Sequence, residues 1–171
     1  MRAQELIRKL GLTPHREGGS FRQVYKSTTQ VQGPKGARSA ATTIYYLLEH
    51  RQFSRWHVVD ADEIWHFYEG APLELFAYEP RSQTLQRHPL HQPGAGAGPG
   101  AGPVAGAGAR AEPVAVIPAG TWQAAHCLGE YALVGCTVAP GFEYADFHLV
   151  SDLADHQRHF AQALRGLEAF L

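Results

Sequence analysis

A histidine and a glutamate, six positions apart, are the residues of this chain best suited to chemistry. His57 and Glu63 lie within the stretch 53–70, FSRWHVVDADEIWHFYEG, which places them among aromatic and acidic residues ahead of a glycine. An imidazole changes its charge near neutral pH, and a neighbouring carboxylate helps to set its tautomer and its pKa. The pair is therefore suited either to binding a metal ion or to transferring a proton.

The alternation of side chains along a strand predicts which residues share a surface with this pair. Every second residue of an extended chain lies on the same face, so His57 and Val59 share one face of a first strand. A short acidic turn follows, and Glu63, Trp65 and Phe67 share one face of the next strand. If both faces point inward, His57 and Glu63 meet in a pocket with aromatic walls.

Several other side chains are candidates for contacting a ligand in such a pocket. Gln123, which follows the turn at 118–120, offers a polar amide. The large aromatic residues are expected in the core, and those nearest the pocket mouth can stack against a ligand ring. Two tyrosines are available as proton donors. The candidate ligand-binding residues are Gln123, Trp65, Phe67, Trp122, Tyr25 and Tyr144.

Some further polar residues are expected to serve structure rather than chemistry. The turn at 17–19, EGG, holds a carboxylate at the mouth of the following strand, where Glu17 and Arg22 can form an ion pair. His66 has the opposite parity to the glutamate of the pair, which favours a packing or interface contact on the other face of its strand. Cys136 lies in a strongly apolar segment and is expected to be an inert, buried thiol.

The composition excludes several classes of partner. Lys and Arg number 15 against 16 Asp and Glu, which leaves a formal net charge of −1 and no basic stripe for nucleic acid or an anionic membrane. The N-terminus interleaves charged with apolar residues, so neither a signal peptide nor a membrane span is expected. The two cysteines lack C-x-x-C spacing, and reduced core thiols favour a cytoplasmic protein. A small neutral or mildly charged ligand is the expected partner.

The order of apolar segments predicts one all-β domain over residues 1–171. Short β-rich segments separated by turns indicate a sandwich or barrel, with short helices expected at 3–10 and 155–170. A polar loop is expected at 30–38, and the Gly/Ala/Pro-rich tract at about 93–109 is expected to be a flexible loop on the rim. The expected strands are 20–27, 40–48, the two strands of the strand–turn–strand unit 53–70, 73–78, 84–88, 114–117 and 131–138.

Two short patterns around these residues are shared with a known superfamily. The pattern H-x-H, followed by Glu and later by Gly, is matched by His57 and Glu63, with Val59 in place of the second histidine. The pattern P-x-G-x-x-H is matched by 118–123, PAGTWQ, with Gln123 in place of its histidine. The chain therefore resembles the cupins, and the Gly/Ala/Pro tract falls in their variable spacer, where insertions are tolerated.

Four longer blocks resemble one group of cupins throughout. They are, in order, EGGSFRQ, ADEIWHFYEG, VIPAGTWQAA and GCTVAPGFEYADF. Four blocks in a fixed order are a specific signal, and the similarity covers roughly residues 5–149 apart from the Gly/Ala/Pro tract. The chain is similar to the fifth cupin subfamily, whose members are largely proteins of unknown function. The resemblance implies an RmlC-like double-stranded β-helix, or jelly-roll barrel, that commonly forms a homodimer.

The resemblance extends to a metal site. Metal-dependent cupins hold a divalent ion with three histidines and a glutamate, a donor set that suits Fe, Mn, Ni or Zn. This chain offers His57, Glu63 and Gln123 as a weaker set, since Val59 has no donor atom. His126 could add a nitrogen only if its strand bulged, because it has the opposite parity to Gln123. Metal binding and a metal-free pocket both stay open.

Three functions are consistent with these residues. The leading hypothesis is a cupin that binds a small, partly apolar metabolite in the barrel, with His57, Glu63 and Gln123 as its polar contacts. If it is an enzyme, a sugar or carbonyl isomerase or epimerase is the expected type. RmlC-type epimerases, which it resembles, use a histidine base and a tyrosine acid. Here His57 would be the base, Glu63 its catalytic partner, and Tyr144 or Tyr25 the acid. The alternatives are a non-catalytic ligand-binding protein and a metal-dependent cupin dioxygenase.

Overall fold

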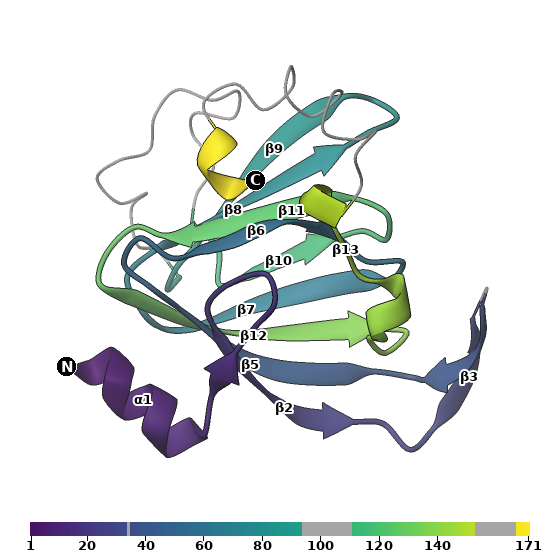
Figure 1. Cartoon of the computed structure of the whole chain (residues 1–171), viewed down its shortest axis with the longest axis horizontal. Helices are drawn as coiled ribbons and strands as arrows, with labels where there is room; N and C mark the ends of the chain where they lie inside the picture. Colours follow the sequence, from purple (N-terminus) through teal and green to yellow (C-terminus); the bar gives the residue numbers. More distant parts are fainter. Residues whose placement is uncertain (34, 94–110, 153–166) are drawn as a thin grey trace.

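Two antiparallel β-sheets face each other and wind into a barrel (Figure 1). The computed structural model describes residues 1–33, 35–93, 111–152 and 167–171. The first sheet has the order β1 (Thr13–Pro14), β2 (Ser20–Lys26), β5 (Thr42–Glu49), β12 (Tyr131–Ala139), β7 (Asp62–Gly70), β10 (Val114–Ile117). The second has the order β13 (His148–Leu149), β6 (Phe53–Val58), β11 (Trp122–Cys127), β8 (Leu73–Glu79), β9 (Thr84–Leu90).

The chain passes back and forth between the sheets as it advances. Strands β5 and β7 lie in the first sheet and β6 and β8 in the second, and β10 to β13 alternate in the same way. This winding is that of a double-stranded β-helix, so the predicted jelly-roll fold is confirmed. The expected strands all form, within a few residues of their predicted ends. The predicted rim loop and most of the predicted C-terminal helix lie outside the described residues.

The segment 30–38 is a β-hairpin, so the prediction of a polar loop there was wrong. Strands β3 (Gln30–Gly33) and β4 (Gly36–Ser39) pair with each other and project from the barrel at the end away from the N-terminus (Figure 1). The glycines that suggested a loop lie at the reversal itself, where Gly36 has φ 118°. The polar residues on either side still form a ladder, because a two-stranded ribbon needs no buried face.

The N-terminal helix covers part of the outer face of the first sheet. Helix α1 (Arg2–Leu10) ends at Gly11, which has the left-handed conformation with φ 63°. Its Leu6 packs with Leu47 and Leu133 of the sheet below it. No helix in the described parts of the chain is long and apolar enough to cross a membrane.

The interior of the barrel is divided along the strands. On β7, Glu63, Trp65 and Phe67 are buried, whereas His66 is half-buried and Tyr68 exposed. The predicted common face is therefore the inner one. Trp65 and Phe67 belong to the main apolar core, while Glu63 lies beyond them, where the core gives way to a cavity. One end of the barrel interior is therefore filled by apolar side chains, and the other end contains a cavity.

Candidate functional site

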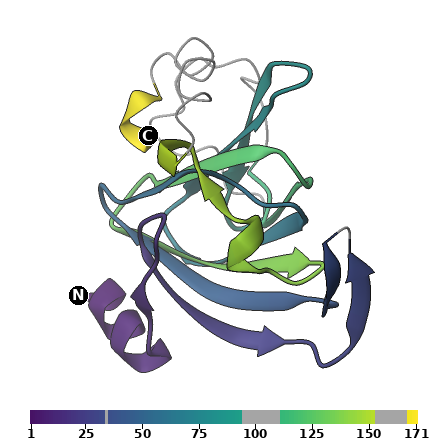
Figure 2. The same ribbon diagram turned by 45° about the vertical axis from the view of Figure 1, so that its right-hand side comes forward.

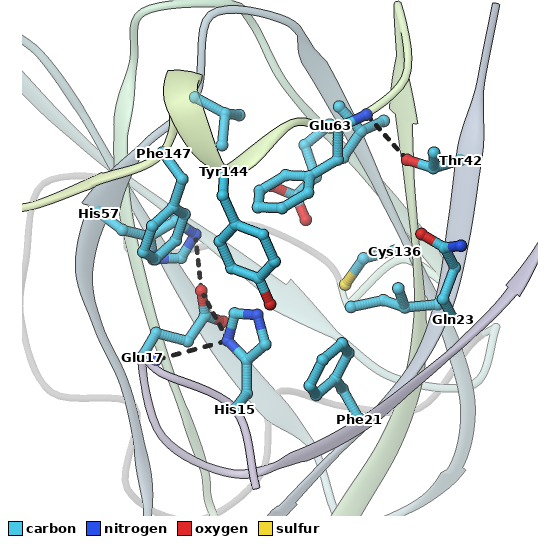
Figure 3. Close-up of a pocket in the computed structure, with 14 residues that line it drawn as sticks. His15, Glu17, Phe21, Gln23, Thr42, His57, Glu63, Cys136, Tyr144 and Phe147 are labelled. Carbon is cyan, nitrogen blue, oxygen red and sulfur yellow. Dashed lines mark hydrogen bonds and ion pairs between the residues drawn. The ribbon is translucent and has the colours of Figure 1, made fainter. Parts of the chain in front are cut away.

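The hollow half of the barrel holds a cavity of about 70 Å³. Both sheets contribute to it, together with the turn between β1 and β2 and the segment that follows β12 (Figure 3). His15, Glu17 and His57 converge at one side, Gln23 and Thr42 lie at the other, and apolar and aromatic groups form most of the remainder (Figure 3). The lining residues are His15, Glu17, Phe21, Gln23, Thr42, Ile44, His57, Val59, Glu63, Cys136, Val138, Phe142, Tyr144 and Phe147.

The ring of His57 is fixed in one tautomer. It is 2% exposed, and its Nδ1 lies 2.8 Å from the carbonyl oxygen of Arg55. A carbonyl only accepts hydrogen bonds, so Nδ1 carries the proton and donates it, which leaves Nε2 with a lone pair. Burial lowers the pKa of His57, and the charge of Glu63 opposes this shift. His57 is therefore a neutral base whose free nitrogen faces the polar side of the cavity.

Glu17 is the residue that His57 faces, and sequence reasoning assigned it a different partner. The Nε2 of His57 lies 3.4 Å from Oε2 of Glu17, and Ser54 Oγ donates to Glu17 Oε1 at 2.9 Å. Burial raises the pKa of Glu17. The predicted ion pair with Arg22 was wrong, because Arg22 is exposed and its guanidinium lies over the ring of Tyr45, on the outer face of the sheet.

A tight turn directs Glu17 into the barrel. Gly18 has φ 115°, and a Cβ at that position would clash with the backbone carbonyl of Phe53. The turn is closed by Tyr46, whose hydroxyl donates to the carbonyl of Gly18 at 2.9 Å. Only a glycine allows the turn to approach β6 so closely. The carboxylate that precedes it therefore points inward rather than along the surface.

His15 completes the polar side of the cavity. Its Nδ1 accepts the backbone N–H of Glu17 at 3.4 Å and lies 3.5 Å from Oε2 of the same residue. Burial lowers the pKa of His15. Figure 3 shows Glu17 lying between the two imidazoles. A carboxylate and two histidines thus converge, although their positions at 15, 17 and 57 gave no sign of it.

Glu63 is held by an amide whose orientation is itself fixed. Trp65 Nε1 donates to Oε1 of Gln123 at 2.9 Å, and Gln123 Nε2 donates to Oε2 of Glu63 at 2.5 Å. An indole N–H is only a donor, so the amide oxygen must face Trp65 and the amide nitrogen must face Glu63. Burial raises the pKa of Glu63 to about 7, His57 opposes the shift and Glu17 adds to it. This carboxyl is poised to gain or lose a proton near neutrality.

The outer wall of the cavity is formed by the segment that crosses from β12 to β13 (Figure 2). It contains the short 3-10 helix η1 (Tyr144–Asp146) and ends before a second one, η2 (Val150–Asp152). Phe142, Tyr144 and Phe147 project from it toward the cavity. Tyr144 is 56% exposed and so lies at the mouth.

The β3–β4 hairpin fastens this wall. Arg38 is buried, donates through Nε to the carbonyl of Gly141 at 2.8 Å, and pairs through Nη1 with Asp146 at 2.8 Å. Lys35 lies 2.7 Å from both Asp146 and Asp60. The wall is therefore held by ion pairs to a hairpin that lies about a hundred residues earlier in the chain.

The structure brings some of the predicted site residues together and separates others. His57, Glu63 and Tyr144 line the cavity. Gln123 is fully buried behind Glu63 and acts on it rather than on the cavity. Tyr25 is 55% exposed and does not line the cavity.

The predicted aromatic contacts lie elsewhere. Trp65 and Phe67 are core residues on the inner face, deeper than the cavity. Trp122 lies in a second apolar cluster with Trp56 and Phe76, on the other face of the second sheet. The aromatic walls come instead from residues that the sequence did not single out, Phe21, Phe142 and Phe147. Two of them lie within the block GCTVAPGFEYADF, which was the available signal.

The donor set does not fit the metal site of metal-dependent cupins. Val59 occupies the position of one histidine, and the oxygen of Gln123 is already taken by Trp65. Within residues 1–33, 35–93, 111–152 and 167–171, no three His, Cys, Asp or Glu side chains are arranged to hold a metal ion. We therefore derive no chemistry through a metal.

Comparisons with known proteins agree with the fold. The model of the family described as Cupin superfamily (DUF985) matches residues 4–150. A protein from Shewanella oneidensis is 30% identical, with a TM-score of 0.72 and coverage of 94% of both chains. A hypothetical protein from Leishmania major is 26% identical, with a TM-score of 0.74 and coverage of 98% of this chain and 96% of that one.

A more distant structural relative has a known activity. Oxalate decarboxylase from Bacillus subtilis is 12% identical, with a TM-score of 0.56 over 91% of this chain and 34% of its own length. At that identity the likeness concerns the fold alone. No curated protein matches the sequence.

Proposed function

We propose that this chain, which belongs to the Cupin superfamily family DUF985, binds a small metabolite in its barrel cavity and transfers a proton on it, as an isomerase or epimerase does. One observation carries the proposal: a buried neutral imidazole and a buried carboxyl that ionises near neutral pH face the same cavity. His57 is a neutral base with a free Nε2, and Glu63 is a carboxyl with a pKa of about 7. Environments that shift the pKa values of a base and an acid in opposite directions are typical of proton-transfer sites.

The chemistry follows from these protonation states. His57 Nε2 takes a proton from a carbon next to a carbonyl, and the electron pair of the broken C–H bond moves into the carbonyl. The protonated form of Glu63 gives its proton to the carbonyl oxygen, which yields a neutral enol. His57 then returns its proton to the former carbonyl carbon, and Glu63 takes the proton of the hydroxyl on the neighbouring carbon, which becomes the new carbonyl. This gives the isomer and restores both side chains.

Neighbouring groups hold His57 and Glu63 in the states that these roles require. The hydrogen bond from His57 Nδ1 to the Arg55 carbonyl keeps the lone pair on Nε2. The Gln123 amide holds Glu63 in place. Tyr144, at the mouth, can contact the substrate with its hydroxyl, whereas Tyr25 lies outside the cavity lining.

Exchange of carbon-bound hydrogen tests the proposal directly. In D₂O, NMR should show deuterium entering a carbon next to the carbonyl of small hydroxy-aldehydes and hydroxy-ketones. His57→Gln and Glu63→Gln should each slow the exchange by about 10² to 10⁴-fold, as expected for loss of a general acid or base. His50→Gln, on an exposed residue far along the sheet from the cavity lining, is the matched control and should retain the rate.

Two results would count against the proposal. Exchange that survives in both cavity variants would place the chemistry elsewhere. Specific binding of a carbonyl compound without any exchange would overturn the catalytic part and identify a non-catalytic ligand-binding protein.

A further inference from the structure

Three hydrogen-bond acceptors converge at one side of the cavity, whose lining also includes the donors of Gln23, Thr42 and Tyr144. His57 Nε2 has no proton, because Nδ1 carries it. His15 Nδ1 accepts the backbone N–H of Glu17 and so has no proton either. Between them lies Oε2 of Glu17, at 3.4 Å from the first nitrogen and 3.5 Å from the second. A carboxylate placed between two such acceptors needs a donor, which is either its own proton or a donor group of a ligand.

The cavity lining offers no cation to meet this need. None of the described lining residues is Lys or Arg. The nearby Arg38 is engaged with Asp146 and the Gly141 carbonyl. Arg55 donates to the carbonyl of Arg16 at 2.6 Å, and its charge is the weakest of the influences on the pKa of Glu17. The donors that reach the carboxylates are neutral: Ser54 and Tyr46 for Glu17, and Gln123 and Cys136 for Glu63.

The remaining walls are those of a site that attracts positive charge. The rings of Phe142 and Tyr144 lie 5.0 Å apart, and Phe147 lies 5.9 Å from Phe142. Phe21 faces them from β2. The faces of aromatic rings attract cations, most strongly where water is excluded. Carboxylates and aromatic rings around a small cavity together favour an ammonium group.

We propose that the ligand of this cavity carries a small ammonium group, whose N–H groups donate to the carboxylates of Glu17 and Glu63 and whose carbon atoms lie against the aromatic wall. An ammonium has donors and no acceptors, which matches these two carboxylates. The assignment deepens the proposed function, because it rests on the same cavity being the ligand site. The volume of about 70 Å³ admits only a small amine.

The same arrangement disfavours anionic ligands. A carboxylate or phosphate would be placed against Glu17 and Glu63 with no described lining cation to neutralise it. Compounds that carry a phosphate or diphosphate should therefore not enter the cavity with that group.

Three compounds of the same size and different charge test the assignment on the full chain. Isobutylamine, isobutanol and isobutyrate share one carbon skeleton and present an ammonium, a hydroxyl and a carboxylate. Titration by NMR or calorimetry at pH 8 should show isobutylamine binding at least about tenfold more tightly than isobutanol, because charge-assisted hydrogen bonds are the stronger ones. Isobutyrate should not bind.

The pH dependence has a definite sign. Isobutylamine stays protonated between pH 6 and pH 8, whereas Glu63 ionises through its pKa of about 7. The affinity for isobutylamine should therefore rise across this range, and the affinity for isobutanol should not follow it. Equal pH responses for the two compounds would contradict the proposal.

Matched variants locate the binding. Glu63→Gln should weaken the binding of isobutylamine by about tenfold or more and should leave the affinity for isobutanol within about twofold of the wild type. Glu112→Gln, on an exposed residue outside the cavity lining, should change neither. An unchanged affinity in Glu63→Gln, equal or tighter binding of isobutyrate, or displacement of the amine by stoichiometric Zn²⁺ would each overturn the assignment.

The outcome is distinguishable from that of the proposed reaction. Binding of isobutylamine without any deuterium exchange would support the ammonium site and overturn only the proton transfer. Deuterium exchange without any binding of isobutylamine would support the proton transfer and overturn only the ammonium site.

Discussion

Two histidine–glutamate pairs, whose histidines lie on the neighbouring strands β6 and β11 of the second sheet, differ in how their charge is balanced. His126 of β11 lies 2.9 Å from Oε2 of Glu74, and Arg87 forms an ion pair with the same carboxylate. His57 of β6 lies 3.4 Å from Glu17, and no described Lys or Arg pairs with that carboxylate. The uncompensated pair is also the more deeply buried one, with side chains 2% and 8% exposed against 27% and 10%.

The difference separates a structural pair from a functional one. Around Glu74, the guanidinium and the imidazole supply the donors that a buried carboxylate needs, so this cluster requires nothing from outside. Around Glu17, the side-chain donors Ser54 and Tyr46 are neutral, and burial raises the pKa values of Glu17 and Glu63. A site that is incomplete in this way gains stability when a ligand completes it.

The largest effect is expected from breaking the balanced pair. Arg87→Met keeps a long apolar side chain but removes the guanidinium, which lies over the ring of Phe76 and pairs with Glu74, so Glu74 stays buried without it. The free energy of unfolding should fall by about 3 kcal/mol or more, as when one partner of a buried pair is removed. Denaturant unfolding measures it. Arg16→Met, which breaks an exposed pair with Asp152, is the control and should cost under about 1 kcal/mol.

The pKa of His126 gives a second readout for the same variant. Arg87 helps to lower it, after burial, so it should rise in Arg87→Met. If the free energy of unfolding of Arg87→Met fell no more than that of Arg16→Met, and the pKa of His126 did not change, Arg87 would not balance the charge of Glu74. The contrast between the two pairs would then be wrong.

The next effect concerns the unbalanced side. The pKa of Glu63 is about 7 in the folded chain and near 4.5 in the unfolded chain. Because the folded pKa is raised, the stability from its protonation is complete below pH 4.5 and is lost as pH rises through 7. The wild type should lose roughly 3 kcal/mol relative to Glu63→Gln between pH 4.5 and pH 8. If the free energies of unfolding of the wild type and of Glu63→Gln changed with pH in the same way across this range, the raised pKa of Glu63 would be contradicted.

A third variant removes one of the few donors of the cavity region. Gln123→Leu leaves the Trp65 N–H without its acceptor and Glu63 without its amide donor. The free energy of unfolding should fall by about 1 to 3 kcal/mol. The pKa of Glu63 should rise further, since the hydrogen bond from Gln123 lowers it. Carbon-detected NMR titration of labelled glutamate follows the pKa. Gln86→Leu, on an exposed position of β9, should alter neither quantity.

The smallest effect concerns the aromatic wall. Tyr144→Ala removes a ring from the cavity mouth and should weaken isobutylamine about threefold, while Tyr144→Phe keeps the ring and the affinity. Both should leave unfolding within about 0.5 kcal/mol of the wild type, because the side chain is largely exposed. Tyr25→Ala is the matched exposed control. Equal losses in Tyr144→Phe and Tyr144→Ala would assign the effect to the hydroxyl instead.

The fold was predictable because its signals are local. Strand periodicity and turn residues placed β2, β5, β7 and β12 correctly, and parity alone put Glu63, Trp65 and Phe67 on one inner face. The β3–β4 hairpin was missed because its polar sequence reads as a loop when no partner strand is in view. The homodimer implied by the resemblance stays a prediction, which light scattering would check.

The site was only partly predictable because its contacts are not local. His57 and Glu63 were found, since they share a strand–turn–strand unit. Glu17 and His15 reach His57 from some forty residues away, through a turn whose direction depends on a close approach of Gly18 to β6. Gln123 was assigned to the ligand because a motif position suggests a function, while its partner Trp65 determines where its amide points.

The contacts between the β3–β4 hairpin and the outer wall affect how fast a bound molecule can leave the cavity. Phe142, Tyr144 and Phe147 line the cavity from one segment, and Arg38 ties that segment down through Gly141 and Asp146. Opening the wall as a unit would require breaking a buried ion pair, which is slow compared with the motion of a free loop. We expect the residence time of a bound molecule to depend on Arg38, a residue outside the cavity lining. How long a molecule stays would then be tuned separately from how tightly the cavity holds it.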